Sequence, residues 1–451
     1  MNSSDQTVVE AIHTLWQPFL LSEESKDFSQ PFRRVVIALS GGMDSVVLLH
    51  AWGQALKSLT EAWQATIRQA TQVVHVHHGL QSSADDWAAF CQQLAIENEW
   101  LFRLERIELP EAMIQQRGLE QAARQLRYQA LQQGLGEGDW LLTAHHQRDQ
   151  AETVLLNLFR GSGVAGLQGM PHKKLLTPSK AMHLRPFLNV PYSVLRAYAE
   201  NHQLQWVEDP SNQQVDFRRN AIRHQVLPAI ERHWPQVQKK VAETAEHLQE
   251  ANALLLELAE ADLSQCPQAS WPASGLTPAY HWIEMAHLQK LSVARIKNAL
   301  RLWFKQQLGQ TIRQQTLQQV LEQMVLSDSV SAKILLQDWE IWKNFGRIYL
   351  VERNFKNNEL YNLSKEIYND FRFEVINPAA LEQIDVEAWS SFAKAKQSAR
   401  FQSSGRYQKW FQKMKIPPWQ RANWPGIWIE NRFILIGMAE CSHCVRLKPG
   451  I

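Results

Sequence analysis

A glycine-rich turn that contains an acid is the part of this sequence whose chemistry can be inferred most directly. It follows a β-branched run, precedes an apolar helical pattern, and has the sequence Ser40-Gly41-Gly42-Met43-Asp44-Ser45. Glycines let the backbone turn tightly and approach a ligand closely. Successive N–H groups at the beginning of a helix favour an anion. The two serine hydroxyls add donors, so the turn is predicted to bind phosphate.

The aspartate in this turn indicates a metal ion. A carboxylate in a phosphate site is understandable if Mg²⁺ lies between Asp44 and the phosphates. A Walker loop would end in Gly-Lys-Ser or Gly-Lys-Thr, and this turn does not. The alternative is a purely structural turn in which the serines and Asp44 cap the helix.

A second polar group follows another apolar run. His145 and His146 are followed by Asp149 and Glu152, which lie three residues apart and therefore share one face of a helix. Two histidines and two acids could suggest zinc. Adjacent histidines at the end of a strand cannot easily point at one ion, however, and either ring could instead be packed and hydrogen-bonded to the backbone.

The elements that must position these turns form a repeating pattern. Short apolar runs at residues 35–39, 73–76 and 140–143 predict buried strands, and three-to-four spacing at 88–97 and 119–132 predicts helices between them. Strands that alternate with helices in this way indicate an α/β fold with a Rossmann-like parallel sheet covered on both faces.

The pattern changes after residue 235. A long helical stretch is predicted at 237–263, a loop at 267–278, further helices at 288–326, strand-like runs at 334–336 and 348–351, and a polar linker at 354–369. We therefore expect a catalytic domain at 1–230, a connecting helix at 231–265, a mainly helical domain at 266–355 and a small α+β domain at 370–451.

Composition limits the class of protein. The chain has 451 residues, a formal net charge of +2 and four cysteines, too few for a disulfide framework in a chain of this length. No apolar run approaches the roughly 20 residues needed to span a bilayer, and the first residues do not form a secretory signal. A cytoplasmic protein of several domains, without a membrane partner, is expected.

The first turn resembles the pyrophosphate-binding loop of the N-type ATP pyrophosphatases, which cleave ATP between the α and β phosphates. Within that superfamily, further segments resemble the lysidine synthetases. In the N-terminal half they are His75-Val76-His77-His78-Gly79-Leu80, Glu120-x-x-Ala123-Arg124-x-x-Arg127-Tyr128, Thr143-Ala144-His145-His146-x-x-Asp149-Gln150-x-Glu152-Thr153, Arg160-Gly161-Ser162-Gly163-x-x-Gly166-Leu167, Glu208-Asp209-x-Ser211-Asn212 and Arg219-Asn220-x-Ile222-Arg223. In the C-terminal part they are Arg400-Phe401, Gly405-Arg406 and Lys415-Ile416-Pro417-Pro418-Trp419-x-Arg421. Many members of that family carry two consecutive acids where this chain has Arg148 before Asp149.

The resemblance implies a reaction in two steps. The 2-oxo oxygen of the wobble cytidine in the CAU anticodon of an isoleucine tRNA attacks the α-phosphate of ATP, and pyrophosphate leaves. The ε-amine of free L-lysine then attacks carbon 2 and expels AMP, giving lysidine. ATP and Mg²⁺ are the implied cofactors, and relatives suggest a homodimer.

The resemblance also assigns candidate residues. Catalysis would fall to Asp44, Asp149, Glu152 and Arg223, with Arg223 on the α-phosphate and Glu152 on the ammonium of lysine. Mg²⁺ would be held by Asp44 and Asp149. ATP would be bound by Ser40, Gly41, Gly42, Met43, Asp44, Ser45, His77 and Gly79. RNA or substrate would be contacted by Arg124, Arg127, His146, Arg406, Lys409, Lys415 and Arg421.

The charge distribution supports an RNA partner. No acid occurs between Glu387 and Glu430, whereas eight lysines and arginines do, with aromatic residues between them. Basic residues attract phosphates, and aromatic rings stack on bases or pack in a core. Arg124 and Arg127 could equally be solvated arginines on a helix face.

Two other functions are considered. A tRNA thiolase of the same superfamily would need cysteines near the ATP site, and the N-terminal half has only Cys91. A binding module that has lost its chemistry would not need the four catalytic candidates. Cys441 and Cys444 look like half of a zinc site, but a second pair is missing from the sequence.

Overall fold

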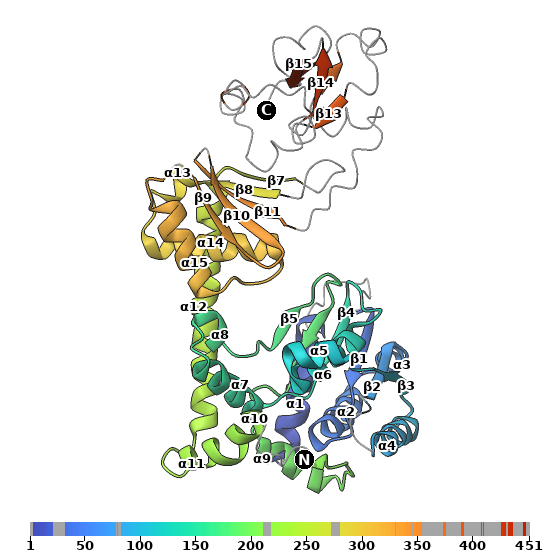
Figure 1. The fold of residues 1–451 in the computed structure, drawn as a ribbon. Helices are drawn as coiled ribbons and strands as arrows, with labels where there is room; N and C mark the ends of the chain where they lie inside the picture. Colours follow the sequence, from blue (N-terminus) through green and yellow to red (C-terminus); the bar gives the residue numbers. More distant parts are fainter. Residues whose placement is uncertain are drawn as a thin grey trace. The chain divides into compact units, whose positions relative to one another are not determined.

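The computed structural model describes most of the chain (Figure 1). The described residues are 3–20, 32–77, 79, 83–210, 218–271, 280–329, 331–344, 346–353, 373–375, 389–391, 407, 409, 425–429, 432–435 and 445–447. They divide into two compact units, Met1–Ala253 and Leu254–Ile451, each described here by itself.

The first unit is built on a six-stranded sheet. Its strands are β1 (Arg34–Ala38), β2 (Thr71–His77), β3 (Leu101–Arg106), β4 (Asp139–Leu142), β5 (Lys173–Leu175) and β6 (Met182–Leu184), in the order β3-β2-β1-β4-β6-β5. All neighbours pair in parallel except β5 and β6, and Ile37 of β1 lies opposite both Val73 and Leu142. The predicted parallel sheet is confirmed.

Helices cover both faces of this sheet. One face packs on α1 (Ser3–Leu20), α2 (Met43–Leu56), α3 (Glu61–Ala70), α4 (Ala84–Glu97) and α9 (Tyr192–Asn201), and the other on α6 (Leu119–Gln132), which follows α5 (Glu111–Arg117). Side chains alternate along a strand, and so Val35 and Ile37 join the first core while Val36 joins the second. The continuous apolar run at 35–39 therefore reflects a strand buried on two sides.

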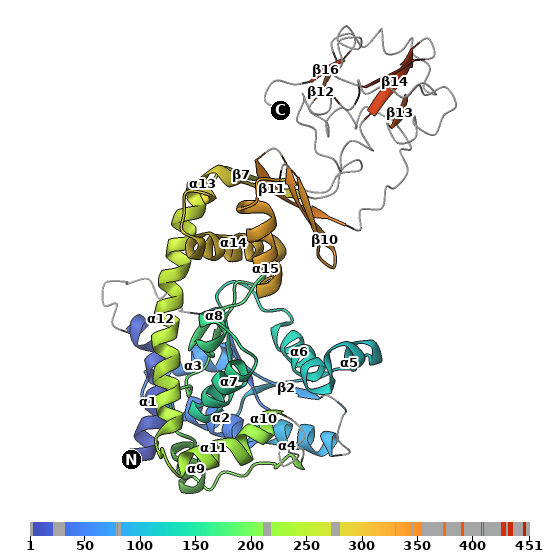
Figure 2. The same ribbon diagram turned by 60° about the vertical axis from the view of Figure 1, so that its left-hand side comes forward.

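A further group of helices completes the first unit. It consists of α7 (Gln147–Phe159), α8 (Val164–Leu167), α10 (Arg218–Ala221), the π-helical segment η2 (Ile222–Val226), α11 (Leu227–Glu231) and the long helix α12 (Val237–Ser264), which continues into the second unit. Ala151 and Leu155 of α7 pack against Ile222 and Leu227. This contact holds η2 and α10 beside α7. Figures 1 and 2 both draw α10 close to α7.

The second unit has its own sheet and core. Its strands are β7 (Gln268–Trp271), β8 (Tyr280–Glu284), β9 (Ala332–Leu335), β10 (Trp339–Asn344) and β11 (Arg347–Glu352), in the antiparallel order β7-β8-β11-β10-β9. Its helices are α13 (Met285–Leu288), α14 (Val293–Leu308), α15 (Gln314–Val320) and the π-helical segment η3 (Leu321–Val325). Trp303 and Phe304 of α14 pack against Ile283, Ile341 and Leu350 of the sheet.

The predicted helices of this unit are present, but its sheet is larger than the sequence indicated. Strand-like runs predicted β9 and β11, whereas β7 begins inside the stretch predicted to be a loop. β7 is an edge strand that pairs only with β8. One-sided pairing does not require the apolar pattern by which a buried strand is recognised.

The C-terminal residues that are described form short strands. β12 (Phe373–Val375) pairs with β16 (Val445–Leu447), and β13 (Trp389–Ser391), β14 (Pro425–Ile429) and β15 (Arg432–Leu435) form a second small sheet. The predicted linker at 354–369 and the cysteines Cys441 and Cys444 lie outside the described residues. The division into four domains stays a prediction.

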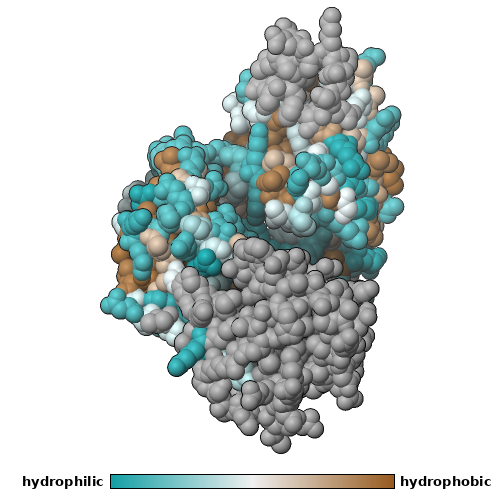
Figure 3. Space-filling model, turned by 90° about the horizontal axis from the view of Figure 1, so that it is seen from above, coloured by the Kyte–Doolittle hydropathy of each residue, from teal (hydrophilic) through white to brown (hydrophobic). Residues whose placement is uncertain are grey.

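The surface is mixed in character. On the face drawn in Figure 3, hydrophilic residues cover most of the described part, with apolar residues among them. Among the described helices, none is both long and apolar enough to cross a membrane.

Candidate active site

The two polar turns predicted from the sequence meet at one edge of the first sheet. Strands β1 and β4 are parallel neighbours, so the turns that follow them, at residues 39–42 and 143–146, leave the sheet at the same edge. Strand β1 lies between β2, the next strand along the chain, and β4. The order of the strands therefore changes direction at β1. Ligands of open α/β sheets bind outside the carboxyl ends of the strands at such a change of direction.

The glycine turn is held in shape by its own serines. Ser45 Oγ donates to the carbonyl of Gly42 at 2.8 Å and accepts from the N–H of Ser40 at 3.1 Å, and the two serine hydroxyls lie 3.0 Å apart. Helix α2 begins at Met43, whose side chain is buried in the core. The first N–H groups of a helix have no partner within it. We expect these groups to donate to a phosphate. The serine hydroxyls fix the turn.

Gly41 requires both its conformation and its lack of a side chain. Its φ is +86°, a region that residues with a Cβ rarely adopt. An added Cβ would lie 2.8 Å from Cγ2 of Val207 and 3.2 Å from Sγ of Cys91. The carbonyl of Gly41 also accepts a hydrogen bond from the N–H of Val207 at 3.0 Å. The turn is thus closely backed by the protein.

His146 caps the helix that carries the two acids. Its Nδ1 accepts from the N–H of Arg148 at 3.2 Å, and its own N–H donates to Oδ2 of Asp149 at 3.1 Å. Because Nδ1 is an acceptor, the ring proton is on Nε2. That nitrogen lies 3.5 Å from a carboxylate oxygen of Asp44 and 3.5 Å from one of Asp149. His146 therefore joins the two turns.

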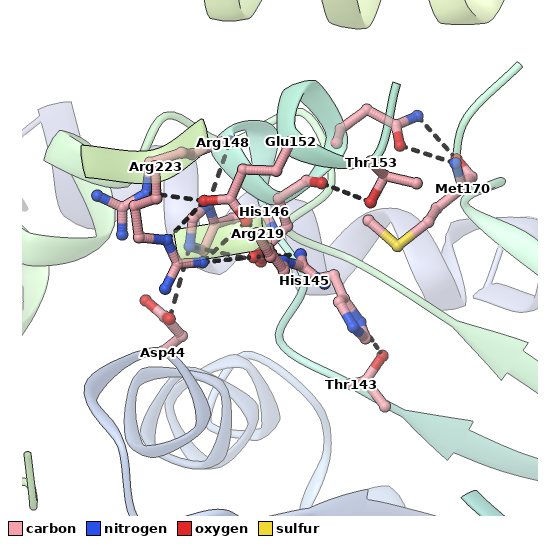
Figure 4. A network of polar contacts seen from close by, with 12 residues as sticks. Asp44, Thr143, His145, His146, Arg148, Glu152, Thr153, Met170, Arg219 and Arg223 are labelled. Carbon is pink, nitrogen blue, oxygen red and sulfur yellow. Dashed lines mark hydrogen bonds and ion pairs between the residues drawn. The ribbon is translucent and has the colours of Figure 1, made fainter. Parts of the chain in front are cut away.

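Two arginines from a distant part of the chain bind the acids of α7 (Figure 4). Arg219 donates from Nε to Glu152 at 2.7 Å and from a terminal nitrogen to Asp149 at 2.9 Å. Arg223 donates from Nε to Glu152 at 2.6 Å, and from a terminal nitrogen to Glu152 at 2.9 Å and to Asp149 at 3.3 Å. Both oxygens of Glu152 are therefore occupied by guanidinium groups. These arginines lie 67 to 74 residues away in sequence from the acids that they bind.

Arg148 lies at the edge of this cluster. Its guanidinium stacks on the ring of Tyr192 at 3.7 Å, and its Nε lies 3.9 Å from Glu152 Oε1. The position at which the resemblance implied an acid is thus filled by a cation that rests on an aromatic ring.

Burial and charge shift the acidity of the cluster. Burial alone would raise the pKa of Asp149, but His146, whose protonated Nε2 faces this carboxylate, and the charged Arg219 outweigh burial and hold that pKa well below its usual range. Burial alone would lower the pKa of His146, yet the carboxylates of Asp149 and Asp44 raise it above its ordinary value. Glu152 is completely buried. Asp149 therefore remains charged at neutral pH, and both acids of α7 are paired with arginines.

The cluster fits a magnesium ion at one position. Oδ1 of Asp44 is buried and has no hydrogen-bond partner among the described residues. Mg²⁺ is usually held by one or two carboxylates together with the phosphates of a substrate. No group of three or more His, Cys, Asp or Glu side chains among the described residues has the arrangement of a metal site. Asp44 thus suits an ion that arrives with a phosphate ligand.

The other candidates lie further out. His77 is at the end of β2, where Asp85 and Arg106 each approach its Nε2 to 3.3 Å, and Gly79 follows with a φ of +65°. Arg124 and Arg127 are on α6, and Lys409 is exposed. Arg406, Lys415 and Arg421 lie outside the described residues. Their proposed contacts with ATP or RNA stay predictions.

The candidate list missed Arg219, although its motif was recognised. Arg219 and Arg223 are four residues apart and approach the same two acids. Spacing alone signals only that both project from one helix face. The acids that they bind are fixed by the packing of Ile222 and Leu227 on α7.

Comparisons with known proteins show which sequences this chain resembles. Family models match at residues 12–230 (PP-loop domain), 284–349 (TilS substrate binding domain) and 394–441 (TilS substrate C-terminal domain). A tRNA(Ile)-lysidine synthase of Hydrogenovibrio crunogenus is 33% identical over 422 residues, which cover 89% of this chain and 92% of that protein. That of Coxiella burnetii is 32% identical over 90% of this chain and 89% of its own length. That of Pseudomonas aeruginosa is 43% identical over 60% of this chain and 58% of its own length.

Proposed function

This chain belongs to the tRNA(Ile)-lysidine synthase family, and from that premise we propose that it joins lysine to carbon 2 of the wobble cytidine in the CAU anticodon of tRNA(Ile). ATP is consumed, and AMP and pyrophosphate are released through an adenylated cytidine. The observation that carries the proposal is the cluster at the ends of β1 and β4. It combines a phosphate-binding turn, an acid with a free oxygen, and two arginines fixed by two buried carboxylates.

The first step needs groups for the phosphates of ATP. The cytosine 2-oxo oxygen forms a bond to the α-phosphorus, and the bond from that phosphorus to the bridging oxygen of pyrophosphate breaks. The N–H groups at the beginning of α2 would bind the leaving pyrophosphate. Arg223, with Arg219 beside it, would bind the α-phosphate, since a guanidinium suits forked contacts to phosphate oxygens. Both arginines are already oriented by Glu152.

Asp44 would hold Mg²⁺ together with the phosphates, with Asp149 as the second candidate. When bound, the ion neutralises charge that builds up on the leaving pyrophosphate. His77 and Gly79, at the end of β2, remain the candidates for the adenosine side of the ATP site.

The second step needs a place for lysine. The ε-amine attacks carbon 2 after losing a proton, the bond from carbon 2 to the oxygen carrying the adenylyl group breaks, and AMP leaves. Glu152 stays our candidate for the ammonium of lysine. Because both of its oxygens bind guanidinium groups, lysine could reach it only if one arginine moves away. Engagement of Arg223 by the α-phosphate in the first step would free one of those oxygens.

A tRNA thiolase is less supported. Cys91 is the cysteine of the first unit, and burial raises the pKa of its thiol to about 12. The thiolate, which would carry sulfur, is therefore scarcely formed at neutral pH. A module that only binds tRNA would not depend on Asp44, so Asp44→Ala would abolish turnover under our proposal and change little in a binding module.

The test is incorporation of labelled lysine into unmodified tRNA(Ile) bearing the CAU anticodon, with ATP and Mg²⁺. A methionine tRNA with the same anticodon is the control. We expect incorporation into the first RNA only, with one AMP and one pyrophosphate released for each lysine. Binding of the tRNA without incorporation would refute the proposed reaction.

The setting of the reaction belongs to the same proposal. Free L-lysine is the second substrate, and a cytoplasmic location would bring it together with tRNA and ATP. We also propose the four-domain division. We further propose a homodimer, which light scattering after gel filtration would test by the mass in solution.

A further inference from the structure

A row of buried and half-buried polar side chains begins at the end of β6 and continues past the end of β4. Arg185 donates from a terminal nitrogen to Nδ1 of His183, at 3.1 Å. Nε2 of His183 lies 2.9 Å from Oγ1 of Thr143, which in turn lies 2.8 Å from Nδ1 of His145. Nε2 of His145 lies 3.5 Å from the hydroxyl of Tyr128 on α6. The row thus joins the ends of β6 and β4 to helix α6.

The direction of every hydrogen bond in the row follows from Arg185. A guanidinium can only donate, so Nδ1 of His183 must accept. Burial lowers the pKa of His183 to about 3, so its ring is neutral and its one proton is on Nε2, which donates to Thr143. Thr143 then has its own hydroxyl proton for Nδ1 of His145.

The same reasoning continues to Tyr128. Burial holds the pKa of His145 well below its ordinary value, so this ring is neutral too. Its Nδ1 accepts from Thr143, and its proton is therefore on Nε2, facing the oxygen of Tyr128. The tyrosine oxygen accepts from this ring, so its own proton must point to another acceptor.

The surroundings of Tyr128 indicate the charge of that acceptor. Arg124 lies over the tyrosine ring at 5.4 Å, and Arg127 is exposed on the same helix. Within the described part of the chain, neither these two arginines nor Arg185 forms an ion pair with a carboxylate. The side chain of Arg185 is only 6% exposed, and its Nε is buried without a hydrogen-bond partner. Uncompensated positive charge of this kind favours a polyanion.

We propose that Tyr128 contacts the RNA substrate, that its hydroxyl donates to a phosphate oxygen of the tRNA, and that Arg185, acting through His183, Thr143 and His145, fixes the direction of that donor. Arg124 and Arg127 bind neighbouring phosphates on the same helix. Tyr128 thereby contacts the RNA backbone without distinguishing its sequence. His183, Thr143 and His145 are positioning residues for the tyrosine hydroxyl. The identity of the RNA as tRNA rests on the proposed function.

The test compares tRNA binding by the wild type, Tyr128→Phe, Thr143→Val and the double variant. Loss of a hydrogen bond to a charged group should raise the dissociation constant for tRNA roughly tenfold in Tyr128→Phe. The KM for tRNA should rise with it, while kcat and the KM for ATP stay unchanged. Thr143→Val removes only the hydroxyl in the row, and should weaken binding about threefold because the tyrosine proton can then turn away. In the double variant, Thr143→Val should add nothing to the effect of Tyr128→Phe.

Two further variants separate an RNA contact from a structural effect. Tyr198→Phe also removes a buried hydroxyl, which lies 2.9 Å from Nδ1 of His50, and should lower thermal stability without changing tRNA binding. Arg127→Gln should reduce the slope of log affinity against log salt concentration by about 1, whereas Tyr128→Phe should leave that slope unchanged.

Two results would overturn the proposal. One is a Tyr128→Phe protein that binds tRNA within twofold of the wild type. The other is a double variant whose loss is the full product of the two single losses, because the row would then not act through the tyrosine hydroxyl. If the wild type incorporates lysine and the first result is found, the proposed function stands and this inference falls. If the wild type binds tRNA without incorporating lysine, the proposed function falls, and the binding constants still decide this inference.

Discussion

Replacing Glu152 by glutamine tests whether the buried carboxylate organises the arginine pair. The substitution keeps the shape of the side chain and removes its charge. Glu152 accepts three hydrogen bonds from Arg219 and Arg223, at 2.6 to 2.9 Å. A glutamine has only one oxygen to accept them, and its NH₂ group would face a guanidinium N–H, which also donates.

The expected loss of stability follows from these contacts. Breaking a buried ion pair by removing one partner costs about 3 to 5 kcal/mol. The arginine side chains are 18% and 19% exposed and keep Asp149 as a partner, so water and Asp149 recover part of that cost. We expect about 3 kcal/mol, the lower end of the range. For a unit of this size that corresponds to a fall in Tm of roughly 6 to 12 °C.

The assay is urea and thermal unfolding of the full chain, together with lysine incorporation. Glu243→Gln is the matched control, because Glu243 forms an exposed pair with Lys240 at 2.8 Å and its replacement should leave stability nearly unchanged. Glu152→Gln should also lower kcat by about 100-fold or more, because the arginines lose their orientation toward the phosphate. A Glu152→Gln protein as stable as the wild type would refute the reasoning, since the three bonds could not then be formed in solution.

Three further outcomes are expected. Gly41→Ala should weaken ATP binding about tenfold and cost about 1 to 3 kcal/mol of stability, because Gly41 has a φ of +86° and an added Cβ would lie 2.8 Å from Val207. Gly53→Ala is its control: Gly53 lies in the interior of α2, its Cβ would lie 3.6 Å from Trp100, and the substitution should instead stabilise by about 0.5 to 1 kcal/mol. Equal effects of the two substitutions in calorimetry would contradict this prediction. Asp44→Asn should lower kcat by about 100-fold and raise the Mg²⁺ concentration needed for half-maximal rate, which a titration at fixed ATP measures. An unchanged Mg²⁺ requirement would show that Asp44 does not bind the metal. Stability should fall as the pH drops below about 6.5, because burial lowers the pKa of His183 to about 3 and the unfolded chain therefore binds a proton before the folded chain does. This histidine should lower the free energy of unfolding by at most about 2 kcal/mol at pH 5. His183→Asn should therefore flatten the pH dependence of urea unfolding. A wild-type stability that rises toward pH 5 would contradict that sign.

The parts of the fold that could be predicted are those whose packing leaves a regular pattern. Helix α6 begins and ends where the three-to-four spacing predicted, and β1 was recognised because it is buried on two sides. Strand β3 was missed because it pairs only with β2 at the edge of the sheet, and none of its residues is fully buried. Strand β6 has only three residues, too few for any periodicity. Local spacing reports burial, so edges and short strands escape it.

The site divides in the same way. The motifs predicted Asp44, Asp149, Glu152 and Arg223 as candidates. The three acids stand at fixed offsets from two turns, whereas Arg223 belongs to a segment that resembles the family. The motifs could not indicate that both oxygens of Glu152 are bound by arginines, or that Arg219 shares them. Those contacts depend on how Ile222 and Leu227 pack on α7, across about 70 residues of chain. Pairing between distant segments is set by the whole fold and leaves no local trace.

The three acids of the site differ in whether their carboxylate oxygens already accept hydrogen bonds, and this difference suggests a role for each. Asp149 and Glu152 are buried and bound by His146 and the arginine pair, so a metal ion or an ammonium would have to displace a bond that already exists. Asp44 is 36% exposed and has a buried oxygen without a hydrogen-bond partner. A carboxylate in that state binds a cation without giving up another contact, and it lies at the beginning of α2, where a phosphate would be bound. We therefore propose Asp44 as the acid that binds the metal, and we propose that Asp149 and Glu152 act first through the arginines that they orient.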